Sequence, residues 1–121
     1  MDCKQSQKHI EENEIYEKCV VSHFEIESID ALKVSYEAIV GAFLNPKNEF
    51  IKSVLESKWY EYIIHILQTA LKVAHQILME NSVLIRCTNG YDRSPEISAL
   101  VQIIIDPYYR TMDGFGVLIE K

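Results

Sequence analysis

The most constraining feature of this sequence is the stretch Ser82–Leu100, which reads SVLIRCTNGYDRSPEISAL. An unbroken apolar run predicts a strand over Val83–Arg86 that is buried on both faces. A short loop follows from Cys87 to Arg93, and the pattern then changes to helical periodicity. Pro95 falls in the first helical turn, where its missing N–H is tolerated. The stretch therefore predicts a strand, a tight loop and a helix in that order.

A second β signal lies near the N-terminus. The segment Glu14–Glu27 contains the apolar run 19–21, followed by alternating apolar and polar residues. Helical patterns separate this segment from Val83–Arg86, so the two strands are expected to be parallel and joined by a right-handed crossover. The predicted fold class is α/β, a Cys-x5-Arg phosphatase-like core fragment of two parallel strands with about four helices.

The helices are predicted from apolar residues three and four positions apart. One begins after Ser28 or Asp30 and ends at Asn45-Pro46, and residues 49–56 supply a further turn or two. The longest helix follows Ser57 as its N-cap. It carries one apolar stripe of Trp59, Tyr62, Ile63, Ile66, Leu67, Ala70, Leu71, Ala74, Ile77 and Leu78. The helix after Arg93 stops at Asp106-Pro107, and the later FGVLI run is open between helix and strand.

The charge and cysteine content exclude several classes of protein. A formal net charge of −6 without a basic face argues against a nucleic-acid binder. Two of the three arginines, Arg86 and Arg93, border the Cys87 loop and form a local cationic spot. The three cysteines show no disulfide or zinc spacing, and no signal peptide is recognised, so reduced thiols in an intracellular protein are expected. No metal or other cofactor is expected.

The Cys87 loop has the chemical groups for phosphate ester hydrolysis. A thiol at the end of a strand, facing loop N–H groups and a helix N-terminus, is predicted to have a lowered pKa and to be nucleophilic. The N–H groups from about Thr88 to Arg93 can form a nest for phosphate oxygens, and Gly90 permits the turn without a clash against the anion. The Arg93 guanidinium can grip two of those oxygens.

Two neighbouring residues complete this hypothesis. Asp92 is the nearest candidate acid for the departing oxygen, and Ser94 can donate a hydrogen bond to the departing thiolate in the second step. The alternative is a structural cysteine followed by a capped helix, and spacing and context alone leave the two interpretations open.

Several segments resemble the myotubularin family of phosphatases. CTNGYDRS resembles the family's active-site signature, usually written CSDGWDRT, and FEIESIDALKVSYEAI resembles its FLEIHNIHVMRESL segment. The helix near Trp59 resembles the family's HWL-helix, and DPYYRTMDGFGVLIEK resembles its DxYYRTIxGFxVLxEK run. The resemblance implies a lipid phosphatase that removes the 3-phosphate from phosphatidylinositol 3-phosphate and the 3,5-bisphosphate. It implies Cys87 as nucleophile, Arg93 as phosphate clamp and Asp92 as general acid.

The resemblance also implies a substrate site with some departures from the family pattern. Asn89 stands where the family has Asp, so a carboxylate that helps to read the inositol head group is replaced by a neutral amide. Arg86 replaces the usual His and adds positive charge. The remaining residues expected to contact substrate are Thr88, Gly90, Tyr91 and Ser94.

The domain expectation is a disordered polar tail over residues 1–13 and a partial myotubularin-like phosphatase domain over residues 14–121. The expected partners are a phosphoinositide head group, a membrane surface and another myotubularin, with a cytoplasmic location peripheral to membranes. The alternative function is an inactive remnant that serves as a phosphoinositide-binding or partner-binding module.

Overall fold

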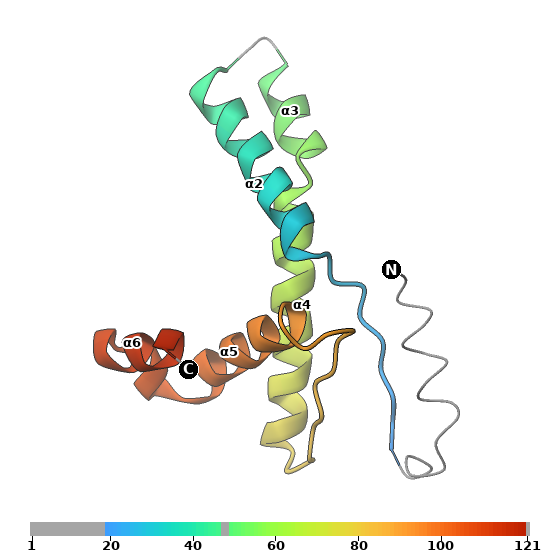
Figure 1. Cartoon of the computed structure of the whole chain (residues 1–121), viewed down its shortest axis with the longest axis vertical. Coiled ribbons are helices and arrows are strands. Elements are labelled where there is room, and N and C mark those ends of the chain that lie inside the picture. The colour runs from blue at the N-terminus through green and yellow to red at the C-terminus, as the bar shows by residue number, and fades with distance from the viewer. Residues whose placement is uncertain (1–18, 47–48, 121) are drawn as a thin grey trace.

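The computed structural model describes residues 19–46 and 49–120, so the expected tail 1–13 and residues 14–18 of the first expected strand lie outside the described residues. The helices are α2 (Ile29–Leu44), α3 (Phe50–Glu56), α4 (Trp59–Leu78), α5 (Arg93–Ile105), the 3-10 helix η2 (Pro107–Arg110) and α6 (Met112–Glu120). Figure 1 shows α4 as the central axis, with α2 and α3 toward its N-terminal end. The α5 helix crosses α4 and leads to η2 and α6 on one side.

The prediction of an α/β fold with two strands is wrong for the described residues. Segments 19–28 and 81–87 are extended, but within residues 19–46 and 49–120 neither belongs to a β-ladder. Leu84 is 75% exposed, which also contradicts the prediction of a strand buried on both faces. A strand needs a neighbour that pairs with its N–H and C=O groups, and here the backbone of each segment lacks that neighbour. The apolar pattern therefore predicted a sheet that the described residues do not form.

Local hydrogen bonds explain where α2 and α4 begin. The Ser28 Oγ accepts a hydrogen bond from the Ala31 N–H at 3.3 Å, which confirms Ser28 as the N-cap of α2. The Ser57 Oγ accepts from the Trp59 N–H at 3.3 Å, but the N-cap position of α4 belongs to Lys58, at a left-handed φ of 58°. The Ser35 hydroxyl donates to the Ser57 carbonyl oxygen at 2.7 Å and ties α2 to this junction.

The C-terminal part is helical throughout. Asp106 ends α5 as predicted, and its Oδ1 accepts a hydrogen bond from the Tyr108 N–H at 2.9 Å to start η2. The Arg110 Nη1 donates to the Ile103 carbonyl at 2.8 Å, so η2 folds back onto the end of α5. The FGVLI run, left open by its sequence, lies within helix α6. Every helix in the described part of the chain is too short or too polar to cross a lipid bilayer.

The hydrophobic core lies where α5 crosses α4. Its buried members are Ile66, Ala70, Val73, Ala74, Ile97 and Val101, and Ala70 is fully buried. A small residue at such a crossing allows two helices to approach closely. The predicted α4 stripe is correct at Ile66, Ala70 and Ala74, whereas Leu67 and Leu71 are exposed because α5 covers only part of the helix. This crossing fixes the start of α5, and with it the Cys87 loop.

Candidate active site

The candidate site lies between segment 81–87 and the N-terminus of α5. Side chains alternate along an extended segment, so Val83, Ile85 and Cys87 share one face of it. Ile85 packs against the core formed by α4 and α5 and anchors the segment. Residues 88–92 then turn back into α5, which begins at Arg93. The predicted order was strand, tight loop and helix; the loop and the helix are present, but segment 81–87 is not a strand.

Hydrogen bonds shape the loop around the thiol. The Gly90 N–H donates to the Cys87 Sγ at 3.1 Å. The Asn89 Oδ1 accepts from the Tyr91 N–H at 3.2 Å and lies 3.8 Å from the Cys87 Sγ, which donates to it. The loop therefore curls over the sulfur and turns backbone N–H groups toward it, as required for a nest that binds an anion.

The hydrogen bonds around Cys87 lower the pKa of its thiol. Burial by itself raises its pKa, but hydrogen bonds from the Ser94 hydroxyl and from the N–H groups of Ser94, Gly90 and Asn89 outweigh it and lower the pKa from 9.0 to about 7. The Ser94 Oγ is buried near the thiol, but its geometry toward the thiol is too poor for a well-formed hydrogen bond in this structure. Its hydroxyl is thus available to donate once the thiol has lost its proton, and about half of the thiol is a nucleophilic thiolate at neutral pH.

Gly90 is required by the backbone and not by crowding. It has a φ of +76°, a left-handed conformation that L-residues with a side chain adopt at a cost. A Cβ at this position would meet nothing within 4 Å. The protein itself thus leaves room for a side chain at position 90, and the predicted clash concerned a bound anion. The feature of the structure that favours glycine here is the left-handed backbone of the turn.

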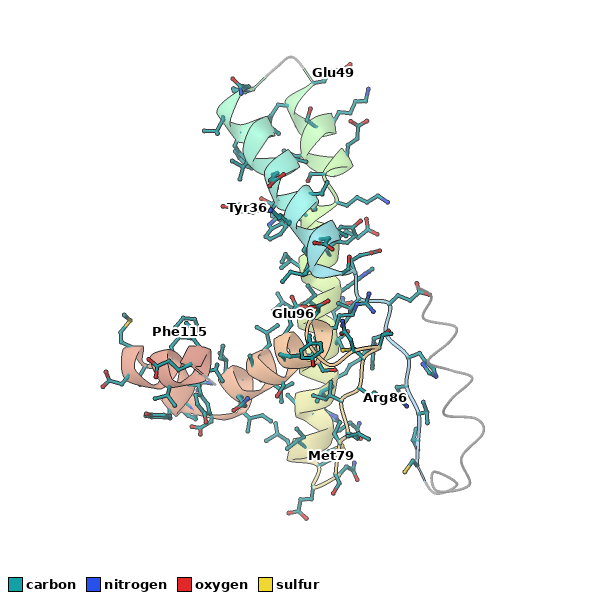
Figure 2. The ribbon with its side chains drawn as sticks, in the orientation of Figure 1. Tyr36, Glu49, Met79, Arg86, Glu96 and Phe115 are labelled. Atoms are coloured by element: carbon teal, nitrogen blue, oxygen red, sulfur yellow. The ribbon has the colours of Figure 1, made fainter. Side chains whose placement is uncertain are left out.

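The other predicted residues lie around the loop without direct contact to the thiol. Asp92 occupies the N-cap position of α5, but its side chain makes no capping hydrogen bond. Arg93 follows as the first helical residue, and Figure 2 shows Arg86 on the segment before the loop. Tyr91 is 84% exposed, and Thr88 is also exposed. The structure brings together Cys87, Asn89, Gly90, Tyr91 and Ser94. Within residues 19–46 and 49–120, no hydrogen bond joins the thiol to Arg86, Thr88, Asp92 or Arg93.

A hollow beside the loop was not predicted from the sequence. It is an open depression of about 410 Å³ lined by Val83, Ile85, Gly90, Ser94, Pro95 and Ser98. Ser94 and Ser98 are one helical turn apart and share a face of α5, and Val83 and Ile85 share a face with Cys87. These two spacings in the sequence could have predicted that the four side chains line a surface next to the thiol.

No candidate metal centre is found in residues 19–46 and 49–120, because no three His, Cys, Asp or Glu side chains there come close enough to hold an ion. The groups at the site are a thiol, hydroxyls, an amide, a carboxylate and two guanidinium groups. These are groups for binding an anion and for nucleophilic and acid–base chemistry.

Comparison with known proteins then decides the family. The sequence matches the family model described as "Myotubularin-like phosphatase domain" over residues 1–121. The chain belongs to the myotubularin-like phosphatase family. The predicted resemblance to the myotubularin family is confirmed.

Three curated members of the myotubularin family illustrate the similarity. Phosphatidylinositol-3,5-bisphosphate 3-phosphatase MTMR4 of Homo sapiens is 35% identical over 112 residues, which are 89% of this chain and 9% of that protein. The 3-phosphatase of the same name designated mtm-1 in Caenorhabditis elegans is 36% identical over 114 residues, covering 92% of this chain and 19% of that protein. Phosphatidylinositol-3,5-bisphosphate 3-phosphatase MTMR6 of Caenorhabditis elegans is 32% identical over 116 residues, which are 94% of this chain and 17% of that protein.

These myotubularin relatives are much longer than the chain, which spans 9 to 19% of their length. No solved structure matches it.

Proposed function

We propose that the chain is a phosphatidylinositol 3-phosphate phosphatase of the myotubularin type, acting on phosphatidylinositol 3-phosphate and the 3,5-bisphosphate. The observation that carries the proposal is the Cys87 loop, where the thiol accepts a hydrogen bond from the Gly90 N–H at 3.1 Å directly before α5. A thiol with a pKa of about 7 in such a loop has the charge state needed to attack phosphorus at neutral pH. The names of the relatives, phosphatidylinositol-3,5-bisphosphate 3-phosphatases, support this choice of substrate class.

In the proposed first step, the Cys87 thiolate attacks phosphorus. The S–P bond forms, the P–O bond to the inositol breaks, and Asp92 gives a proton to the departing oxygen. The loop N–H groups and the Arg93 guanidinium stabilise the negative charge of the three other phosphate oxygens. The carboxyl group of Asp92 lies directly before α5 and makes no capping hydrogen bond, so helix capping does not occupy it.

In the proposed second step, water attacks the phosphocysteine. Asp92 accepts a proton from the water, the S–P bond breaks, and the Ser94 hydroxyl donates a hydrogen bond to the departing thiolate. The buried and unpartnered Ser94 Oγ supports this assignment. Arg86, Thr88 and Tyr91 are proposed to contact the inositol head group from the exposed rim of the loop.

The test is phosphate release by the purified 121-residue chain from vesicles that contain phosphatidylinositol 3-phosphate. Cys87→Ser is expected to abolish release, because a serine hydroxyl is not ionised at neutral pH. Cys19→Ser is the matched control, since Cys19 is an exposed thiol outside the loop and its loss should leave release unchanged. Release no greater than that of Cys87→Ser, from a chain that is folded by circular dichroism, would refute the enzymatic proposal.

A second function is favoured by the small core of the described residues. The buried core is centred on one helix crossing, and segments 19–28 and 81–87 are unpaired within the described residues. In this alternative, the loop holds a phosphoinositide or the chain binds a partner without turnover. Vesicle co-sedimentation that depends on phosphatidylinositol 3-phosphate, together with the absence of phosphate release, would support the alternative.

Location and assembly are part of the proposal as well. A phosphoinositide head group lies at the lipid–water interface, so the proposed enzyme works in the cytoplasm at the periphery of a membrane. Pairing with a second myotubularin is proposed because large apolar side chains such as Phe43 and Leu55 remain exposed. Light scattering of the chain alone and mixed with a longer myotubularin measures that pairing.

A further inference from the structure

Asn89 has the most connected side chain of the Cys87 loop. Its Oδ1 accepts a hydrogen bond from the Tyr91 N–H at 3.2 Å, and the Cys87 Sγ donates to the same oxygen at 3.8 Å. Gly90, between these residues, turns its N–H to the Sγ at 3.1 Å. One side-chain oxygen therefore joins the nucleophile to the backbone beyond the glycine.

The amide of Asn89 makes these contacts without a charge. The family signature has Asp at this position, and a carboxylate there would accept the same hydrogen bonds. It would also place a full negative charge at the present Oδ1 position, 3.8 Å from the sulfur. Two negative charges at that separation repel strongly, even near a protein surface, so a carboxylate would oppose ionisation of the thiol.

We propose that Asn89 is a positioning residue of the Cys87 loop, whose neutral oxygen holds the protonated thiol and the loop backbone together and places less negative charge beside the thiolate than a carboxylate would. The consequence for turnover rests on the proposed function, whereas the consequence for the thiol itself does not. The thiol of this chain is accordingly more reactive at neutral pH than it would be with the family's Asp.

The other charged groups near the loop do not replace this role. Arg86 precedes the thiol, Asp92 and Arg93 begin α5, and Glu96 follows in the first turn, where burial raises its pKa. Figure 2 labels Arg86 on the segment before the loop and Glu96 on α5. No ion pair joins any of these four residues to another in residues 19–46 and 49–120. All four stay unchanged in the variants below, so a change in thiol reactivity reports on position 89.

The test is the rate of Cys87 alkylation by iodoacetamide as a function of pH, measured by mass spectrometry of the Cys87 peptide. Cys19 in the same sample is the internal reference, because it is an exposed thiol outside the loop. In Asn89→Asp, the midpoint of the Cys87 curve is expected to rise by about one pH unit, which slows alkylation at pH 7 about fivefold. The Cys19 curve should not move.

A second measurement separates the hydrogen bond from the charge. Hydrogen exchange of the Tyr91 amide, followed by NMR, should accelerate severalfold in Asn89→Ala, which lacks the acceptor, and should stay slow in Asn89→Asp, which keeps it. An unchanged alkylation midpoint in Asn89→Asp would overturn the electrostatic role. Unchanged Tyr91 exchange in Asn89→Ala would overturn the positioning role. Both measurements are made without turnover, so an inactive chain would refute the proposed function and leave this inference intact.

Discussion

Replacing Ile97 with alanine should loosen the whole candidate site, because this side chain fastens α5 to α4. Ile97 is 2% exposed and belongs to the core with Ile66 and Ala70. The substitution removes three carbon groups from the core. At about 0.8 kcal/mol for each, the transfer free energy is roughly 2.4 kcal/mol, and the cavity left behind raises the cost to about 3 kcal/mol.

Ile51→Ala is the matched control. Ile51 also lies in a helix, α3, but it is 74% exposed, so the same three groups are already largely in water. Its expected cost is below about 1 kcal/mol. Both substitutions gain the same helix propensity of a few tenths of a kcal/mol, which cancels in the comparison.

The assay is urea unfolding followed by circular dichroism at 222 nm, with the free energy of unfolding compared between the two variants. Alkylation of Cys87 in the folded protein is measured alongside. Because the Cys87 loop leads directly into α5, Ile97→Ala should also raise the alkylation midpoint of Cys87. Equal free energies of unfolding for Ile97→Ala and Ile51→Ala would refute the conclusion that the α4–α5 crossing is the core.

Three further predictions concern single residues of the loop and of the C-terminal helices. Gly90→Ala should cost about 1 kcal/mol in urea unfolding, since its φ of +76° is strained for alanine while its Cβ would meet no other atom; an unchanged free energy of unfolding would argue against the left-handed turn. Ser94→Ala should move the alkylation midpoint of Cys87 from about pH 7 toward 9, because the hydroxyl stabilises the thiolate that is present above pH 7 and lost below it. The same variant should keep its thermal midpoint well below pH 7, where the thiol is protonated, and should melt at a lower temperature above pH 7, where the hydroxyl stabilises the thiolate. An unmoved alkylation curve would contradict the role of the hydroxyl. Gly114→Ala should destabilise α6 by about 1–3 kcal/mol, because the added Cβ would overlap the Tyr108 carbonyl oxygen. Gly116→Ala in the same helix is the control, since a Cβ there meets nothing within 4 Å. Equal melting temperatures of the two variants would refute this packing.

Much of the candidate site was predictable because its chemistry is local. Cys87, Gly90 and the start of α5 lie within seven consecutive residues, and the loop followed by a helix was predicted from the sequence, whereas the predicted strand before them is not formed. Gly90 has a left-handed φ, a conformation that only glycine adopts freely. The contact from the Asn89 Oδ1 to the Tyr91 N–H was not predicted, because the sequence does not fix the side-chain rotamer.

The sequence by itself determined helices α2 to α5, the family and the Cys87 loop. Ser28 starts α2 and Asp106 ends α5 through hydrogen bonds to residues two to four positions away, so their neighbours in sequence were sufficient. Tertiary structure alone decided that segments 19–28 and 81–87 are extended without a ladder, and which side of α4 is buried. The physical reason is the range of the interactions. A cap is satisfied within one turn of chain, whereas a strand and a helix face are stabilised only by partners that local sequence does not specify.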